Sequence, residues 1–247
     1  MPYCGLRDAY QRLNNDHGIR EESLSSSYFT SIGTTVHSVF QQWLGYTKVK
    51  VVLIGDWKCL SCKKIQHFKP KPKTCKCGKS NFSYKELGGI DSGVVFWHCD
   101  GILRIKTKKN TWYIIIDFKT TSIDAVRKYL QTRAGFPYIS NIAQLKAYCV
   151  LVERKYRIKI SGAALIYLAR DHPIKNYAVV PVTIDEEEKQ KTARRLLKDI
   201  SHFQIVSQLE SRQDLKILVK EKPCRNREEY MKNMYSYFNP CPLAKVC

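Results

Sequence analysis

The sequence has no long apolar run and no apolar leader. No stretch approaches the ~20 consecutive apolar residues that a membrane-spanning helix needs. The first ten residues, MPYCGLRDAY, lack the apolar core of a secretory signal. We therefore expect no membrane partner and a cytoplasmic, reducing setting. A compact, lysine-rich single chain of this kind suits a phage protein in the infected host cell or a mobile-element protein.

Acidic residues are scarce relative to basic ones. The chain has 22 Asp and Glu against 42 Lys and Arg, which gives a formal net charge of +20. Such an excess attracts a polyanion and makes its binding strongly salt-dependent. We therefore expect a nucleic-acid partner, although a basic protein without one would have the same composition. With 247 residues, 44% of them hydrophobic, the chain can bury one good core, which predicts one domain with an insertion.

Cysteine, in contrast, is plentiful. Ten cysteines in a reducing setting are better explained by metal sites than by disulfides. The first group is Cys59-x2-Cys62 followed by Cys75-x-Cys77-Gly78. Two short knuckles with four thiolates can close a tetrahedral zinc site, and the glycine allows a tight turn. Four thiolates leave no open position, so we expect a structural zinc ion; an incidental or redox cysteine pair is the alternative.

Lysines and a KPKPK sequence crowd the segment around these cysteines. Because this composition cannot pack a core, residues 56–82 are predicted to form a zinc-ribbon insertion, here called the ribbon. The main domain would then comprise residues 1–55 and 83–247. The ribbon would either grip nucleic acid or dock a replication or recombination protein. Trp57 beside it is expected in the core, although it could stack on an unpaired base.

The run YIIIDFKTT, residues 113–121, places an acid and a lysine at the end of a hydrophobic strand. Asp117 and Lys119 are two residues apart and share a strand face, where they could hold a divalent metal and steady a water or phosphate. Surface strands often carry such a pair without function, so the motif alone favours an ordinary ion pair. Asp100, in the strand-like run FWHCDGILRI, could place a second carboxylate on the same metal.

Two helix-like segments surround these strands. GTTVH, ending at His37, precedes them, and QLKAY follows them with Gln144 and Tyr148 on one helix face. Alone, a helical His37 or a Gln144–Tyr148 pair is more ordinary than functional. Helices are predicted at residues 3–15, 27–44, 123–132, around Gln144 and at 186–209, and strands at 49–54, 93–106, 112–119, 163–169 and 177–184. This alternation predicts an α/β fold with a mixed central sheet flanked by helices.

The order GxxxH, a strand with D-G, a strand with D-x-K, then QxxxY resembles the RecB-like branch of the PD-(D/E)xK nucleases. Within it, the chain is similar to the iron–sulfur exonucleases, which include AddB-type nuclease domains and the CRISPR-adaptation nuclease. Cys99 stands where the family often has proline, and Asp117 where many members have glutamate. The resemblance implies a restriction-endonuclease-like fold and a DNA nuclease. That nuclease would act on single-stranded DNA or frayed duplex ends in replication, recombination or repair.

The resemblance also implies roles for individual residues. The ligands of Mg²⁺ or Mn²⁺ would be His37, Asp100, Asp117 and the Phe118 carbonyl. Lys119 would orient or deprotonate the attacking water, Gln144 would position the water or a phosphate, and Tyr148 would contact the DNA backbone or Lys119. The competing interpretation is a nucleic-acid-binding accessory protein with a vestigial nuclease site, and an RNA-directed zinc-ribbon protein is a third.

The remaining cysteines divide into a terminal group and two isolated thiols. In the iron–sulfur exonucleases one early cysteine joins three near the C-terminus, which here would be Cys4, Cys224, Cys241 and Cys247. Cysteine ligation is the usual way to hold a [4Fe–4S] cluster, and a second zinc ion is the alternative. Cys99 and Cys149 stand in apolar runs and are predicted to be buried core thiols.

Overall fold

A computed structural model describes residues 24–45, 50–93, 95–171 and 173–208. The chain divides into two units, and the larger one, Glu22–Arg194, contains every described element except the end of the last helix. The helix predicted at residues 3–15 and the terminal cysteines Cys4, Cys224, Cys241 and Cys247 lie outside the described residues.

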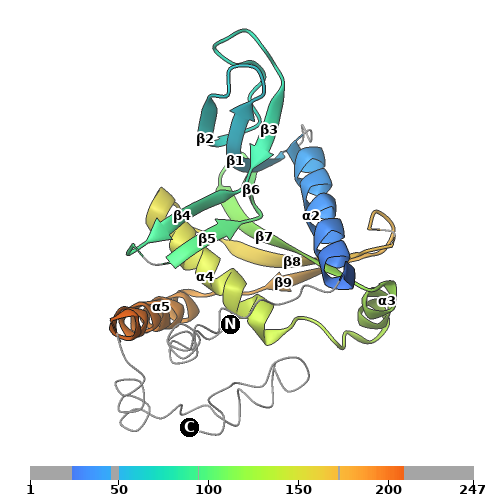
Figure 1. Ribbon diagram of the computed structural model, residues 1–247, viewed down its shortest axis with the longest axis vertical. Coiled ribbons are helices and arrows are strands. Elements are labelled where there is room, and N and C mark those ends of the chain that lie inside the picture. The colour runs from blue at the N-terminus through green and yellow to red at the C-terminus, as the bar shows by residue number, and fades with distance from the viewer. Residues whose placement is uncertain (1–23, 46–49, 94, 172, 209–247) are drawn as a thin grey trace, which may run out of the picture. The chain divides into compact units, whose positions relative to one another are not determined.

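A seven-stranded sheet forms the centre of the larger unit (Figure 1). Its strands are β1 (Val51–Cys59), β2 (Ile65–Pro70), β3 (Phe82–Lys85), β6 (Gly101–Lys106), β7 (Thr111–Thr121), β8 (Gly162–Ala169) and β9 (Tyr177–Val182). They lie in the order β2-β1-β6-β7-β8-β9, and β3 also pairs with β1. β7 and β8 run parallel, whereas the other pairs are antiparallel, so the sheet is mixed as predicted.

Four helices accompany the sheet: α2 (Leu24–Gly45), α3 (Ile123–Thr132), α4 (Ile139–Tyr156) and α5 (Glu186–Ser207). The parallel β7–β8 pair requires a crossover connection, and α3 and α4 form it. α2 contacts β1, β3 and β7, while α4 contacts β5, β7 and β8. The predicted α/β class is therefore confirmed. No helix among the described residues is both long and apolar enough to cross a bilayer.

Strand β7 is buried at its centre, where the four consecutive residues 115–118 are all shielded from solvent. Ile115, Ile116 and Phe118 are at most 1% exposed. Since neighbouring strand residues point to opposite faces, this run shows that both faces of β7 are covered. Asp117 lies within the run and is therefore held in the protein interior. Cys99 and Cys149 are fully buried, which confirms their prediction as core thiols.

The predicted strand at residues 93–106 is wrong as a single element. It is divided into β5 (Val95–Cys99), which forms a separate two-stranded sheet with β4 (Leu87–Asp91), and β6, which joins the central sheet. Asp100 occupies the break between β5 and β6. The chain therefore changes sheets at the residue whose carboxylate is expected to bind a metal.

The ribbon begins inside the central sheet. The first half of β1 pairs with β6, whereas its second half pairs with β2 and β3. Trp57 on β1 is 0% exposed, donates a hydrogen bond to the Lys69 carbonyl at 2.9 Å and meets the Tyr84 ring edge-on at 5.2 Å. This confirms Trp57 as a core residue and removes it as a base-stacking platform.

Candidate functional site

The Asp-x-Lys motif of β7 is joined to α4 by a row of polar contacts. Lys119 Nζ lies 2.9 Å from Asp117 Oδ2 and donates a hydrogen bond to Gln144 Oε1 at 2.8 Å. Gln144 Nε2 in turn donates to the Tyr148 hydroxyl at 2.7 Å. The shared strand face and the i, i+4 helix spacing explain why these four side chains meet.

Asp100 joins the same group from the break between β5 and β6. Its Oδ2 accepts a hydrogen bond from the Phe118 N–H at 2.7 Å. His37 Nδ1 lies 3.6 Å from the same oxygen, and the His37 ring packs against the Phe118 ring with centroids 5.7 Å apart. The structure therefore brings together the side chains of His37, Asp100, Asp117, Lys119, Gln144 and Tyr148.

Gly33 explains how α2 can deliver His37 to this place. A Cβ atom on Gly33 would lie 3.2 Å from Thr120 Oγ1 of β7, closer than most real Cβ contacts. The missing side chain lets α2 approach the end of β7, and His37 follows one helical turn later. The GxxxH spacing thus places a close helix–strand approach one turn before the histidine.

Burial dominates the electrostatics of the two aspartates. Burial, followed by the Asp117 charge, raises the pKa of Asp100 to about 7, against the hydrogen bond from Phe118. Burial also raises the pKa of Asp117, even though the Lys119 ammonium lowers it. For His37, burial and then the Lys119 charge lower the pKa, which favours the neutral imidazole that binds metals.

One buried carboxylate oxygen of this site is held by charge. Asp117 Oδ2 is buried, and the Lys119 ammonium lies 2.9 Å from it without a well-aligned hydrogen bond. A buried carboxylate oxygen is the kind of ligand that Mg²⁺ or Mn²⁺ takes. Two carboxylates and a neutral imidazole are donor types that suit such an ion, but the ligand atoms of His37, Asp100 and Asp117 do not all lie within 4.8 Å of one another.

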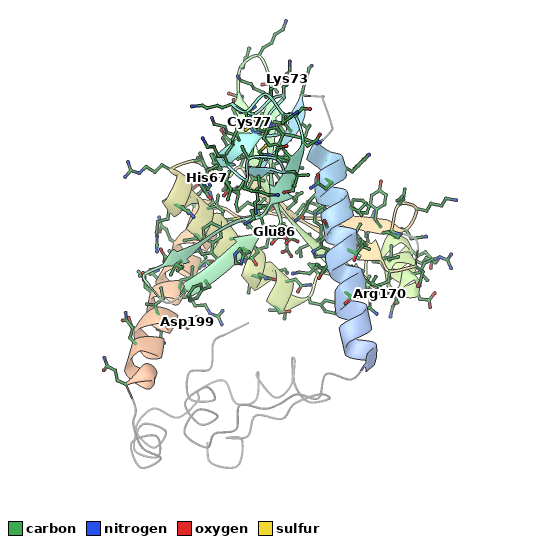
Figure 2. All side chains as sticks on the ribbon, turned by 45° about the horizontal axis from the view of Figure 1, so that its top comes forward. His67, Lys73, Cys77, Glu86, Arg170 and Asp199 are labelled. Atoms are coloured by element: carbon green, nitrogen blue, oxygen red, sulfur yellow. The ribbon has the colours of Figure 1, made fainter. Side chains whose placement is uncertain are left out.

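Glu86, which follows β3, is a site residue that the sequence motifs did not reveal. Gln41 Nε2 donates to Glu86 Oε1 at 2.9 Å and to the Asp100 carbonyl at 3.0 Å. The Glu86 charge raises the pKa of both Asp100 and His37. In Figure 2, red oxygen atoms gather beside Glu86. Gln41 was detectable in principle, since it stands four residues after His37 on the same helix face.

The four predicted zinc ligands form a second, separate group. The Cys59 and Cys77 sulfurs lie 3.7 Å apart, and those of Cys62 and Cys75 lie 3.5 Å apart. A tetrahedron with zinc–sulfur bonds of about 2.3 Å has edges of about 3.8 Å, so these spacings suit a zinc ion. Among the described residues, this is the one group of at least three His, Cys, Asp or Glu ligand atoms within 4.8 Å of one another.

The backbone of each knuckle supports this arrangement. The Lys63 N–H donates to the Cys59 carbonyl at 2.9 Å, and the Gly78 N–H donates to the Cys75 carbonyl at 2.9 Å. Lys63 and Gly78 have φ angles of 62° and 81°, so each knuckle closes through a left-handed residue. This is the tight turn predicted for Gly78. The cysteine group can thus bind a metal ion such as zinc.

The stability of the metal-free protein is expected to depend on pH through the buried Asp100 carboxyl. In the folded state its pKa is about 7, whereas in the unfolded chain it is about 4. Between these values the folded protein holds the extra proton, so its stability rises as the pH falls. Asp100→Asn removes this titration and should be more stable than wild type at pH ~8. The difference in unfolding free energy between the two proteins should shrink by up to ~1.4 kcal/mol per pH unit as the pH falls from about 7 to 4.

Urea unfolding of both proteins across this range, without divalent cations, measures this difference. A difference that stays constant with pH would contradict a raised Asp100 pKa. Asp124→Asn, at an exposed position on α3, controls for the loss of a carboxylate.

Comparison with known proteins adds no assignment to this geometry: no family model matches the chain, and neither does any curated protein.

Proposed function

We propose that the protein is a metal-dependent DNA nuclease, an exonuclease acting on single-stranded DNA or frayed duplex ends. The observation that carries the proposal is the buried Asp117 carboxylate paired with Lys119, in a site that Asp100 and His37 also enter. The order of these residues along the chain, with its resemblance to RecB-like iron–sulfur exonucleases, supports the same activity.

The metal ligands would be His37, Asp100, Asp117 and the Phe118 carbonyl. When bound there, Mg²⁺ or Mn²⁺ lowers the pKa of a coordinated water and polarises a phosphoryl oxygen. Its charge would also offset the mutual repulsion of the buried carboxylates, which raises the pKa of Asp100. The structural zinc of the ribbon takes no part in this chemistry, because its four thiolates fill the coordination shell.

Lys119 serves as the partner of the water and the scissile phosphate. Asp117 and Gln144 fix its ammonium from two sides, which limits the conformations that it can adopt. From this position it orients the attacking water and offsets the negative charge that grows on the phosphate. Because it is ion-paired, its role is to orient and to stabilise charge.

Tyr148 completes the row as a hydrogen-bond donor. Its hydroxyl oxygen accepts from Gln144, which leaves the hydroxyl hydrogen for a backbone phosphate. Burial, followed by the Asp117 charge, raises the pKa of Tyr148, so the hydroxyl stays protonated. Tyr148 therefore binds the DNA backbone and does not act as a base.

A time course on end-labelled DNA tests the proposal. Purified protein with Mn²⁺ or Mg²⁺ should shorten single-stranded DNA, and duplexes with blocked ends should resist while those with free ends are degraded. Omission of divalent cation should abolish cleavage. RNA of the same sequence distinguishes an RNA-directed enzyme. A protein that binds these substrates but cleaves none of them with either ion would instead be an accessory protein with a vestigial site.

The terminal cysteines Cys4, Cys224, Cys241 and Cys247 are proposed to hold a [4Fe–4S] cluster by the same resemblance. Anaerobically purified protein should then be brown and contain iron besides the zinc of the ribbon. Zinc alone, in twofold molar amount, would instead assign a second zinc ion to these residues.

A further inference from the structure

The ribbon concentrates positive charge around the four cysteines. Its residues 56–82 contain eight lysines and one acidic residue, Asp56. Asp56 is occupied within the ribbon, because its carboxylate lies 2.7 Å from His67 Nδ1 and accepts the Phe68 N–H at 2.9 Å. The lysines are therefore not neutralised by the ribbon's own acid.

Most of these lysines face solvent. The six exposed ones are Lys63, Lys64, Lys69, Lys73, Lys76 and Lys79. None of the six forms an ion pair with an acidic residue in the described part of the chain. Figure 2 shows Lys73 and Cys77 at the end of the ribbon, with blue nitrogen-tipped side chains extending from it. The knuckles and strands β2 and β3 hold these charges on a fixed backbone.

The aromatic side chains of the ribbon, in contrast, are buried or stacked on other rings of the protein. Trp57 is 0% exposed and Phe82 is 5% exposed. Phe68 stacks on Tyr156 of α4, with ring centroids 4.2 Å apart and planes 12° from parallel. Proteins that hold single strands by their bases offer open aromatic faces for stacking. The ribbon offers charge without such a platform.

The base of the ribbon lies next to the acidic site. Tyr84 on β3, two residues after the ribbon ends, is paired with Trp57 and donates its hydroxyl to the Asp100 carbonyl at 3.0 Å. Glu86 follows directly after β3. A polyanion held on the ribbon is therefore held on the structural element that leads into the carboxylate group.

From these observations we infer that the ribbon is a second nucleic-acid contact surface, which grips the sugar–phosphate backbone through charge and does not read bases. Lysine ammonium groups bind phosphate as point charges, and their contacts carry no sequence information. Binding at the ribbon is therefore strongly salt-dependent and indifferent to sequence. The inference concerns binding alone and stands whether or not the acidic site hydrolyses DNA.

The test removes three lysines of the second knuckle together, in the variant Lys73→Gln, Lys76→Gln, Lys79→Gln. The matched control removes three exposed lysines near the β6–β7 turn, in the variant Lys106→Gln, Lys108→Gln, Lys109→Gln. Both variants carry three fewer positive charges than wild type. Zinc content and thermal unfolding verify that both retain the fold. Fluorescence anisotropy with labelled single-stranded and duplex DNA, without divalent cation, then measures Kd over a range of salt concentrations.

The ribbon variant should bind every oligonucleotide about tenfold more weakly or worse, by the same factor for different base sequences. Its slope of log Kd against log salt should fall by roughly one for each phosphate that the variant no longer binds, up to three. The control variant should change Kd much less. Equal effects of both variants, or a weakening confined to one base sequence, would overturn the inference. Unchanged DNA binding by the ribbon variant would overturn it too and would direct attention to an acidic protein partner.

The two proposals fail separately. The anisotropy assay omits divalent cation, so its Kd values do not depend on whether the acidic site cleaves DNA. Loss of cleavage with intact ribbon binding therefore bears only on the proposed function.

Discussion

Asp117→Asn is expected to abolish metal-dependent cleavage while leaving DNA affinity unchanged. The substitution keeps the size of the side chain but removes the buried charge that a divalent cation would bind at Oδ2. Loss of the metal removes both the activation of water and the polarisation of the phosphate. We expect a fall in rate of ~10³-fold or more, equivalent to ~4 kcal/mol of transition-state stabilisation. Single-turnover cleavage of end-labelled DNA measures this rate.

Lys119→Gln should lower the rate comparably, since it removes the ammonium that Asp117 and Gln144 hold. Asp124→Asn removes a carboxylate from the exposed face of α3 and should retain wild-type activity. Anisotropy without divalent cation should give similar Kd values for all three variants. If Asp117→Asn cleaved DNA at the wild-type rate with Mn²⁺, the acidic site would not be the catalytic one.

Cys75→Ser is expected to release the ribbon metal and to destabilise the larger unit as a whole. Cys75 and Cys59 belong to one buried cluster with Trp57, Phe82 and Phe118. Loss of the metal would remove the bonds that join the two knuckles beside that cluster, with a cost of at least ~4 kcal/mol, in the range seen when structural metals are removed. Metal analysis and urea unfolding measure the two effects.

The control for this prediction is Cys149→Ala, at a buried cysteine of α4 outside the four-sulfur group. This variant should retain one zinc ion in the ribbon. It should lose only the small amount of unfolding free energy expected for the removal of one core sulfur. If Cys75→Ser released its metal but unfolded at the wild-type urea concentration, the ribbon would be energetically independent of the sheet.

The same cluster predicts that the ribbon metal supports the acidic site indirectly. Phe118 follows Asp117, and its N–H binds Asp100. Phe40 of α2 and Tyr84 of β3 also pack against this cluster. Zinc-free protein should therefore lose cleavage activity even when Mn²⁺ is supplied in excess.

Parts of the structure that depend on local geometry were predictable from the sequence. The helix predicted at residues 123–132 is α3, which begins after Ser122, whose side chain accepts the Ala125 N–H. The common face of Asp117 and Lys119 follows from the two-residue period of a strand. The four-cysteine group follows from the requirements of tetrahedral coordination.

Parts that depend on tertiary packing were not predictable. Glu86 reaches the site because β3 pairs with β1 and Gln41 of α2 bridges it to Asp100. Neither contact leaves a periodic signal in the sequence. The break at Asp100 was missed although Asp100-Gly101 is a turn signal, because the apolar residues on both sides of it favour strand, while the chain passes between two sheets.

Strand β1 has a consequence for how this protein can change over evolution. One continuous strand pairs with β6 at its start and carries Trp57 and Cys59 at its end. A ribbon joined by flexible linkers could be deleted or exchanged as a cassette without harm to its host. Here, excision would remove core side chains together with the cysteines, so the ribbon and the sheet must be inherited together.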